Sequence, residues 1–267
     1  MNRTNCSYCN NDKTLTKEHL WPKSLHKRLK RANSQDKSII WLSRLQRVIS
    51  SEPQIRDVCG ACNNGVLSNL DDYICQLFDD IFIHLPERDE VVDFQFNYHL
   101  LKRWLLKLSY NSARVHESED LVPLKTLLPY ILGENTSSGR SVQLFVQLTY
   151  PELVNAKDLT LDVESDGILT LYPDINRIGH MYFEVPGIGK KILRAIHIRS
   201  FTFLIAFWEP GRGRAEQKDF ESVFVSNTPG VKLLRPSKDK ERLVCNGKGA
   251  LSSVKHSRGK FIFDERL

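Results

Sequence analysis

The chain has 267 residues, of which 41% are hydrophobic and 26% are charged, and its net charge is +6 at pH 7. These proportions are those of a folded globular protein, and no apolar run approaches the roughly 18 residues of a membrane span. Because the N-terminus is polar from Met1 onward and has no apolar signal segment, we expect a soluble, cytoplasmic protein without membrane association.

The positive charge is concentrated in the first fifty residues. Residues 1–50 contain eleven Lys and Arg against three acidic residues, a net charge of +8, which leaves −2 for the remainder. Such a basic segment suits contact with a nucleic-acid backbone, because cations placed against phosphates release condensed counterions. A solvated basic face is the alternative, and charge alone does not separate the two interpretations.

Four of the six cysteines form two CxxC pairs, namely Cys6 with Cys9 and Cys59 with Cys62. Two thiolates at positions i and i+3 can bind one tetrahedral ion, and a second pair completes the shell. Because residues 1–70 contain few core-forming side chains, this segment is expected to need such a staple in order to fold. The sequence therefore predicts a structural Zn²⁺ bound by these four thiols.

Downstream, hydrophobic periodicity predicts helices followed by strands. Helices are expected at 66–82, 95–116 and 121–132, the last ending at Gly133. Segments rich in Val, Ile, Thr, Phe and Tyr predict strands at 141–150, 158–164, 167–173, 180–186 and 195–210, with short connections that favour an antiparallel sheet. The predicted fold class is α+β: a zinc-stapled module at 1–72, then a domain at 73–267 that is helical to about residue 133 and mainly strands thereafter.

A second pattern lies between the CxxC pairs, where residues 17–23 read Lys-Glu-His-Leu-Trp-Pro-Lys. Asn63 and Asn64 follow the second pair directly. The order CxxC, Glu-His-x-x-Pro, CxxC-Asn resembles the HNH endonuclease family, in the branch whose ββα-metal core carries a structural zinc. The resemblance covers roughly residues 6–72, about a quarter of the chain.

This resemblance implies a catalytic role for three residues. His19, at the end of the first strand, would be the general base that activates water, and an imidazole suits that task because its pKa lies near the working pH. Glu18 and Asn63 would bind a divalent ion that stabilises charge at the scissile phosphate. Oxygen ligands of this kind favour Mg²⁺ or Mn²⁺ over zinc.

The pattern departs from the family in two places. The family often has an Asn before the second CxxC, where this chain offers Gln54, and its last metal ligand is frequently a His, where this chain has Asn63. Asn64 and Asp71 are alternative ligands, and Asn63 could instead cap the following helix. In addition, Glu18 and His19 are neighbours on a strand and point to opposite faces unless the chain turns there.

The segment 23–31 carries the cations expected to contact phosphates, and the alternative is a solvated turn of helix. These cations are Lys23, Lys27, Arg28, Lys30 and Arg31. The function favoured by the whole pattern is a metal-dependent endonuclease that hydrolyses phosphodiester bonds, with DNA as the expected substrate. Analogy with the family suggests an anti-phage defence or mobile-element setting, including a homing enzyme. The alternative is a non-catalytic zinc-containing nucleic-acid-binding or adaptor protein that recruits a protein partner through residues 73–267.

Overall fold

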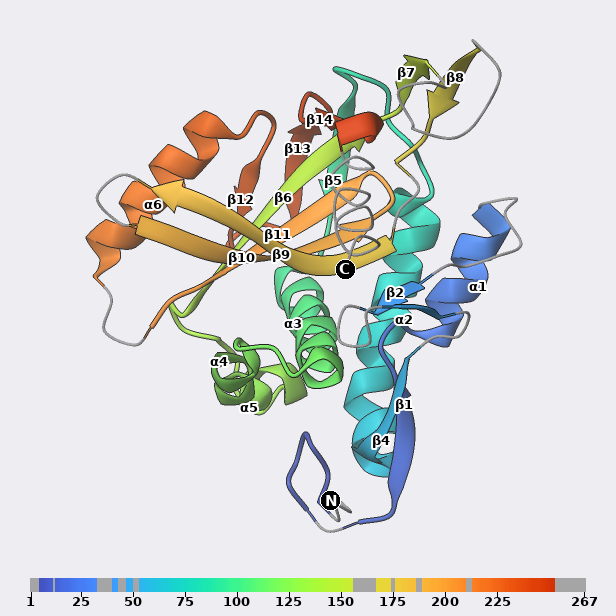
Figure 1. The fold of residues 1–267 in the computed structure, drawn as a ribbon. Coiled ribbons are helices and arrows are strands. Elements are labelled where there is room, and N and C mark those ends of the chain that lie inside the picture. The colour runs from blue at the N-terminus through green and yellow to red at the C-terminus, as the bar shows by residue number, and fades with distance from the viewer. Residues whose placement is uncertain are drawn as a thin grey trace. The chain divides into compact units, whose positions relative to one another are not determined.

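The computed structural model describes residues 5–11, 13–32, 40–42, 47–49, 53–155, 167–173, 176–185, 189–209 and 213–252. The chain divides into two compact units. Unit 1 comprises Met1–Ile81 and Phe96–Val142, and unit 2 comprises Phe82–Gln95 and Gln143–Leu267. Helices and antiparallel sheets are both present, in agreement with the predicted α+β class (Figure 1).

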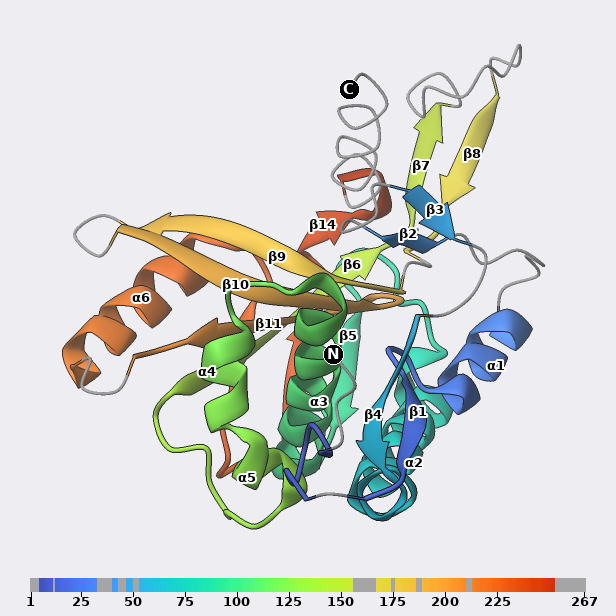
Figure 2. The same ribbon diagram turned by 60° about the horizontal axis from the view of Figure 1, so that its bottom comes forward.

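Unit 1 begins with two strands that lead into a helix. Strand β1 (Leu15–His19) pairs antiparallel with β4 (Gln54–Cys59), with a break in register between Thr16 and Lys17. The chain continues from β4 into the π-helical η1 (Cys62–Leu67), α2 (Ser68–Leu77) and η2 (Phe78–Phe82). Figure 2 shows β1 and β4 side by side, next to α2. The helix expected over 66–82 is thus present, although it begins earlier and is kinked at Gly65.

A helix and a pair of short strands lie between β1 and β4 in the sequence. Helix α1 (Lys23–Ala32) buries Leu25 and Leu29. Strands β2 (Ile40–Leu42) and β3 (Arg47–Ile49) pair with each other antiparallel.

Helix α3 (Tyr98–His116) is the longest helix of unit 1 and supplies much of its core, including Trp104 and Leu105. It begins three residues later than expected because the Asn97 side chain caps it, accepting a hydrogen bond from the Leu100 N–H at 3.0 Å. Many polar side chains of α3 are also buried, which an amphipathic surface helix would not require.

The single helix expected over 121–132 is two helices, α4 (Leu121–Thr126) and α5 (Leu128–Leu132). Pro129 explains the break, because it has no N–H for the preceding turn and its ring crowds that turn. The predicted end at Gly133 is confirmed, since this glycine adopts a φ of 82° after the last residue of α5.

Unit 2 is built on a sheet in the order β12-β6-β11-β10-β9, with β14 beside β6. Its strands are β6 (Val142–Tyr150), β9 (Asn176–Val185), β10 (Gly189–Ile198), β11 (Phe201–Phe207), β12 (Lys232–Leu234) and β14 (Lys248–Gly249). Helix α6 (Arg214–Asn227) places Phe220 and Phe224 against Phe145 and Leu193 of the sheet. This apolar contact forms the main core of unit 2.

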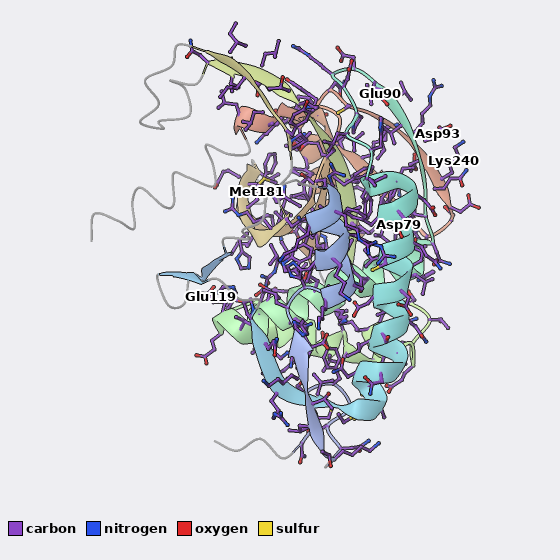
Figure 3. The ribbon with its side chains drawn as sticks, turned by 90° about the vertical axis from the view of Figure 1, so that its right-hand side faces the viewer. Asp79, Glu90, Asp93, Glu119, Met181 and Lys240 are labelled. Atoms are coloured by element: carbon purple, nitrogen blue, oxygen red, sulfur yellow. The ribbon has the colours of Figure 1, made fainter. Side chains whose placement is uncertain are left out.

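Two smaller strand pairs complete unit 2. Strand β5 (Val91–Gln95) pairs with β13 (Lys240–Val244), where Lys240 and Asp93 form an ion pair of 3.0 Å at the position labelled in Figure 3. Strand β7 (Glu152–Asn155) pairs with β8 (Ile168–Leu171).

The strand expected over 195–210 is wrong as a single element. It consists of the second half of β10 and of β11, which form a hairpin through Arg199 and Ser200. Arg199 adopts a φ of 51°, a backbone conformation that Gly or Asn usually occupies in a hairpin turn. Because this turn contains neither residue, the sequence did not indicate it. The strands at 141–150, 167–173 and 180–186 are present with shifted ends, and the expected strand at 158–164 lies outside the described residues.

Unit 1 is larger than the segment 1–72 that carries the HNH resemblance, because α3, α4 and α5 belong to the same unit as the cysteine pairs. The predicted division at residue 72 was drawn around the nuclease resemblance and stays a prediction about function. Within the described part of the chain, no helix combines the length and the apolar character that crossing a membrane demands.

Candidate metal centre and candidate active site

The four cysteines of the CxxC pairs meet at one place in unit 1. Their Sγ atoms all lie within 4.8 Å of one another, and those of Cys9 and Cys59 are 3.8 Å apart. A tetrahedral zinc with Zn–S bonds of about 2.3 Å places its sulfurs about 3.8 Å apart, so the spacing fits the ion. These thiols can therefore hold a metal ion such as zinc, as the sequence predicts.

The backbone around the cluster also suits thiolate ligands. The Cys59 N–H donates to the Cys6 Sγ at 3.2 Å, while Asn10, with a φ of 56°, returns the first turn through a hydrogen bond from its N–H to the Cys6 carbonyl. Burial tends to raise the pKa of the Cys6 thiol, but N–H groups of the two turns outweigh it and lower that pKa to about 7. Burial raises the pKa of Cys62.

Side chains of α3 hydrogen-bond to the turn that contains Cys6 and Cys9. The Tyr8 hydroxyl donates to Asn111 Oδ1 at 2.6 Å, and the Tyr110 hydroxyl donates to the Ser7 carbonyl at 2.9 Å. Tyr8 and Tyr110 also pack edge to face, with ring centroids 5.2 Å apart. The turn that presents Cys6 and Cys9 is therefore anchored to a helix about a hundred residues away in the sequence.

A buried ion pair reinforces this anchor. Arg114 of α3 donates to Asp57 Oδ1 of β4 at 2.5 Å and to Ser7 Oγ at 2.6 Å. Both members of the pair are almost fully shielded from solvent. Because a buried charge is costly without its partner, Asp57 and Arg114 depend on each other for the stability of this corner.

Glu18, a predicted ligand of the catalytic ion, is buried and already has cationic and amide partners. Its Oε1 lies 3.0 Å from Lys107 Nζ and accepts a hydrogen bond from Asn111 Nδ2 at 3.2 Å. Lys107 Nζ also lies 2.7 Å from Asp71 Oδ2, which was an alternative ligand in the sequence analysis. One ammonium group thus bridges both carboxylates.

His19, the predicted general base, is the last residue of β1 and lies opposite Gln54 of β4. Its ring is partly exposed, yet Nδ1 is buried and has no hydrogen-bond partner. Strand β1 continues through both Glu18 and His19, so successive side chains leave the strand on opposite faces. The turn that the sequence analysis required between them does not occur; the strand ends only after His19.

Asn63 connects the start of η1 to β1. Its Nδ2 donates to Thr16 Oγ1 at 2.9 Å and to the Lys17 carbonyl at 3.1 Å. This amide therefore has a structural role in joining the two segments. Within the described part of unit 1, no hydrogen bond or ion pair joins the side chains of Glu18, His19 and Asn63 to one another.

The cations expected to contact phosphates lie on α1, whose apolar residues are buried. Lys23, Lys27, Lys30 and Arg31 are exposed. Arg28 differs, because its guanidinium is 2.8 Å from Asp79, the η2 residue labelled in Figure 3. The hydrogen bond to Asp79 raises the pKa of Arg28, which commits this cation to a protein partner.

The residues that sequence reasoning missed lie on α3. Lys107, Asn111 and Arg114 are buried and all contact the strands or turns of the candidate site. Their spacing of four and three residues places them on one face of a helix. This spacing is a sequence signal that could have identified them as a group. Hydrophobic periodicity alone predicts this helix, and the polar residues beside its apolar face make the contacts with the site.

Comparison of the chain with protein-family models, with curated proteins and with solved structures finds no match.

Proposed function

We propose that the chain is a metal-dependent endonuclease of the HNH type that hydrolyses phosphodiester bonds in DNA. Two strands followed directly by a helix, with four thiols gathered at their junction, support this proposal. The HNH resemblance implies the same order of elements. Exposed cations on α1, inserted between the two strands, support contact with a phosphate backbone.

The state of His19 is the observation that carries the proposal. A buried polar nitrogen without a partner is unfavourable and calls for an explanation. In our proposal, Nδ1 of His19 carries no proton and is opened to water when substrate binds, so that it can take a proton from the attacking water. His19 also stands at the end of β1, the position that the resemblance assigns to the base.

The proposal places a divalent ion, Mg²⁺ or Mn²⁺, beside the scissile phosphate, where it would stabilise developing negative charge. Glu18 and Asn63 are the residues proposed to hold it. In the described geometry Lys107 neutralises Glu18, and the side chains of Glu18 and His19 leave β1 on opposite faces. Before cleavage Glu18 must therefore exchange its ammonium partner for the ion and change its orientation relative to His19. The described arrangement, with Glu18 paired to Lys107, is then the resting state of the enzyme. We propose anti-phage defence or a mobile element as its biological setting.

The test is cleavage of a supercoiled plasmid by the full chain in Mg²⁺ and, separately, in Mn²⁺. We expect wild-type cleavage, and we expect His19→Ala to reduce the rate at least about a hundredfold because general-base catalysis contributes that much. His84→Ala is the matched control, since His84 is an exposed histidine of unit 2 that pairs with Glu90. Equal cleavage by the His19→Ala protein would refute the assignment.

The burial and pairing of Glu18 favour a second candidate, a non-catalytic zinc-containing nucleic-acid-binding or adaptor protein. In that case Glu18 and Lys107 are purely structural. DNA would be retained in a gel-shift assay by both wild type and His19→Ala, and neither protein would cut it in either metal. Retention without cutting therefore selects this candidate over the nuclease.

A further inference from the structure

Strands β1 and β4, side by side in Figure 2, carry different charges on their two faces. The Glu18 side chain is bound by side chains of α3. Successive residues of a strand point to opposite faces, so Lys17 and His19 lie on the other face of β1. Directly opposite residues of paired strands share a face, which adds Arg56 opposite Lys17 and Gln54 opposite His19. These four positions carry two cations, an amide and the proposed general base, and none of them is acidic.

The two cations of this face are held against each other. Lys17 and Arg56 are both exposed and lie directly opposite one another. The Cβ atoms of such a pair are about 4.5–5.5 Å apart, and like charges at these positions destabilise a sheet. Neither cation takes part in any of the described ion pairs of unit 1, and the acidic neighbours Glu18 and Asp57 are already paired with cations of α3. The described protein therefore does not compensate this repulsion with a carboxylate.

Hydrogen bonds to the backbone of β1 fix the position of both residues. Asn63 Nδ2 donates to the Lys17 carbonyl at 3.1 Å, which holds β1 at this point. Arg56 Nη1 donates to the Leu15 carbonyl at 3.3 Å, so the guanidinium reaches across to β1. A guanidinium has five N–H donors, and the described hydrogen bonds of Arg56 engage one nitrogen. Because the side chain is already positioned, it loses less conformational freedom when it binds a ligand.

The cationic pair is close to the proposed general base. Lys17 precedes His19 by two residues, and a strand rises 3.2–3.4 Å per residue, so their backbones are roughly 6–7 Å apart. Each strand of DNA carries one phosphate per about 3.4 Å of the helix axis. A DNA strand whose scissile phosphate lies at His19 therefore brings a neighbouring phosphate within reach of the two cations.

We propose that Lys17 and Arg56 form a phosphate clamp that binds the DNA backbone next to the scissile phosphate. The planar guanidinium matches two phosphate oxygens, and the ammonium group adds a point charge from the opposite strand. The bound phosphate supplies the negative charge that the described protein does not, and it relieves the repulsion between the cations. Its position beside the scissile bond rests on the proposed nuclease function. Because phosphate contacts position a protein without reading sequence, the clamp aligns the strand with His19 and gives no base preference.

The first test is binding of a short fluorescein-labelled DNA duplex to the full chain, followed by fluorescence anisotropy without added Mg²⁺ or Mn²⁺. We expect Lys17→Gln and Arg56→Gln each to weaken binding about threefold or more, and the double variant about tenfold or more. The slope of log affinity against log salt should become shallower by about 1 in the double variant, because one phosphate contact is lost. Lys125→Gln removes an exposed lysine of α4 in the same unit and should bind like wild type.

Urea unfolding of the same variants tests whether the two cations serve the fold instead. Either substitution removes a like-charge repulsion, so the urea midpoint of each single variant should equal or exceed that of wild type. A lower midpoint would show that Lys17 or Arg56 stabilises the strand pair, and it would overturn the proposal.

Plasmid cleavage in Mg²⁺ distinguishes failure of the clamp from failure of the nuclease function. If wild type and the double variant bind and cut DNA equally well, the clamp is refuted and the nuclease function stands. If the double variant binds tenfold more weakly and neither protein cuts, the clamp stands as a DNA-binding site and the nuclease function fails.

Where wild type cuts, saturating protein should restore most of the cleavage rate of the double variant, because the clamp binds the strand and does not react. The His19→Ala protein should show no such recovery. Absence of DNA binding by wild type, or a loss of affinity in Lys125→Gln as large as that in Arg56→Gln, would also overturn the proposal.

Discussion

At the scale of single residues, two buried lysines of α3 differ in whether an acidic partner compensates their charge. Lys107 has two carboxylates within 3.0 Å, whereas Lys102, five residues earlier on α3, has none among the described ion pairs. Lys102 Nζ donates instead to Tyr98 Oη at 3.1 Å and to the Val142 carbonyl at 2.8 Å, and it lies 5.3 Å from the centre of the Tyr98 ring. Burial lowers the pKa of Lys102 from 10.5 to about 7.

This lowered pKa predicts a stability that rises with pH. Below pH 7 the lysine is protonated in both folded and unfolded chains, and the folded state carries the full cost of the buried charge. Between about pH 7 and pH 10.5 only the unfolded chain holds the proton, so the free energy of unfolding rises as pH increases, by up to about 1.4 kcal/mol per pH unit. Urea unfolding at several pH values should show a smaller rise in Lys102→Met than in wild type.

The control for this measurement is Lys125→Met, which removes an exposed lysine of α4 in the same unit. Its pH dependence should follow that of the wild type, because this side chain is exposed to solvent in the folded chain as well as in the unfolded one. Parallel curves for wild type and Lys102→Met would show that Lys102 remains charged in the folded protein and would contradict the prediction.

At the scale of the elements, the end of α5 depends on one glycine. Gly133 has a φ of 82°, and a Cβ at this position would lie 2.7 Å from Arg103 Nη2. Arg103 cannot move freely, since its Nε donates to the Ile131 carbonyl at 3.0 Å. The termination of α5 and the position of this arginine are therefore coupled.

We expect Gly133→Ala to lower the free energy of unfolding by about 2–3 kcal/mol, the sum of left-handed backbone strain and a disturbed hydrogen bond. Gly139→Ala is the matched control, because Gly139 has a φ of 61° but nothing within 4 Å of the added Cβ. It should cost only about 1 kcal/mol, the backbone term alone. If chemical denaturation gave the same loss of unfolding free energy for Gly133→Ala and Gly139→Ala, the Arg103 side chain would have moved away from the added methyl group without an energetic penalty, contrary to the prediction.

At the scale of the whole molecule, the two units differ in what holds them together. The front of unit 1 relies on the thiol cluster and on the polar contacts of α3, whereas unit 2 has a core of phenylalanine side chains between α6 and its sheet. We propose that the four thiols hold a structural metal. Because such a metal contributes directly to folding free energy, its loss should affect unit 1 selectively.

Removing metal with a strong chelator should therefore raise amide hydrogen exchange in β1, β4 and η1 while leaving β9–β11 as protected as before. Cys62→Ser should reproduce this pattern without chelator, and Cys245→Ala, which replaces a buried thiol of unit 2 outside the cluster, should not. Exchange that rises equally in both units would mean that the chain unfolds as one cooperative body, and exchange that rises nowhere would mean that the thiols hold no structural ion.

The sequence by itself determined the features whose signals are local. The spacing of the two CxxC pairs identified the four thiols that meet, and Gly133 marked the end of a helix. Periodicity located α2 and α3, and residue composition located β6 and β8. Each of these depends on residues within a few positions of one another, apart from the meeting of the two pairs, which the chemistry of a tetrahedral ion requires.

Only the tertiary structure decided which partners the polar side chains have. Glu18 looked like a free metal ligand, but it is bound by Lys107 and Asn111 from a helix about ninety residues later, and Asp93 on β5 pairs with Lys240 across 147 positions. Charge attraction and strand pairing act through space and leave no period in the chain. The sequence therefore indicated which groups could do chemistry, and the fold determined which of them are already engaged.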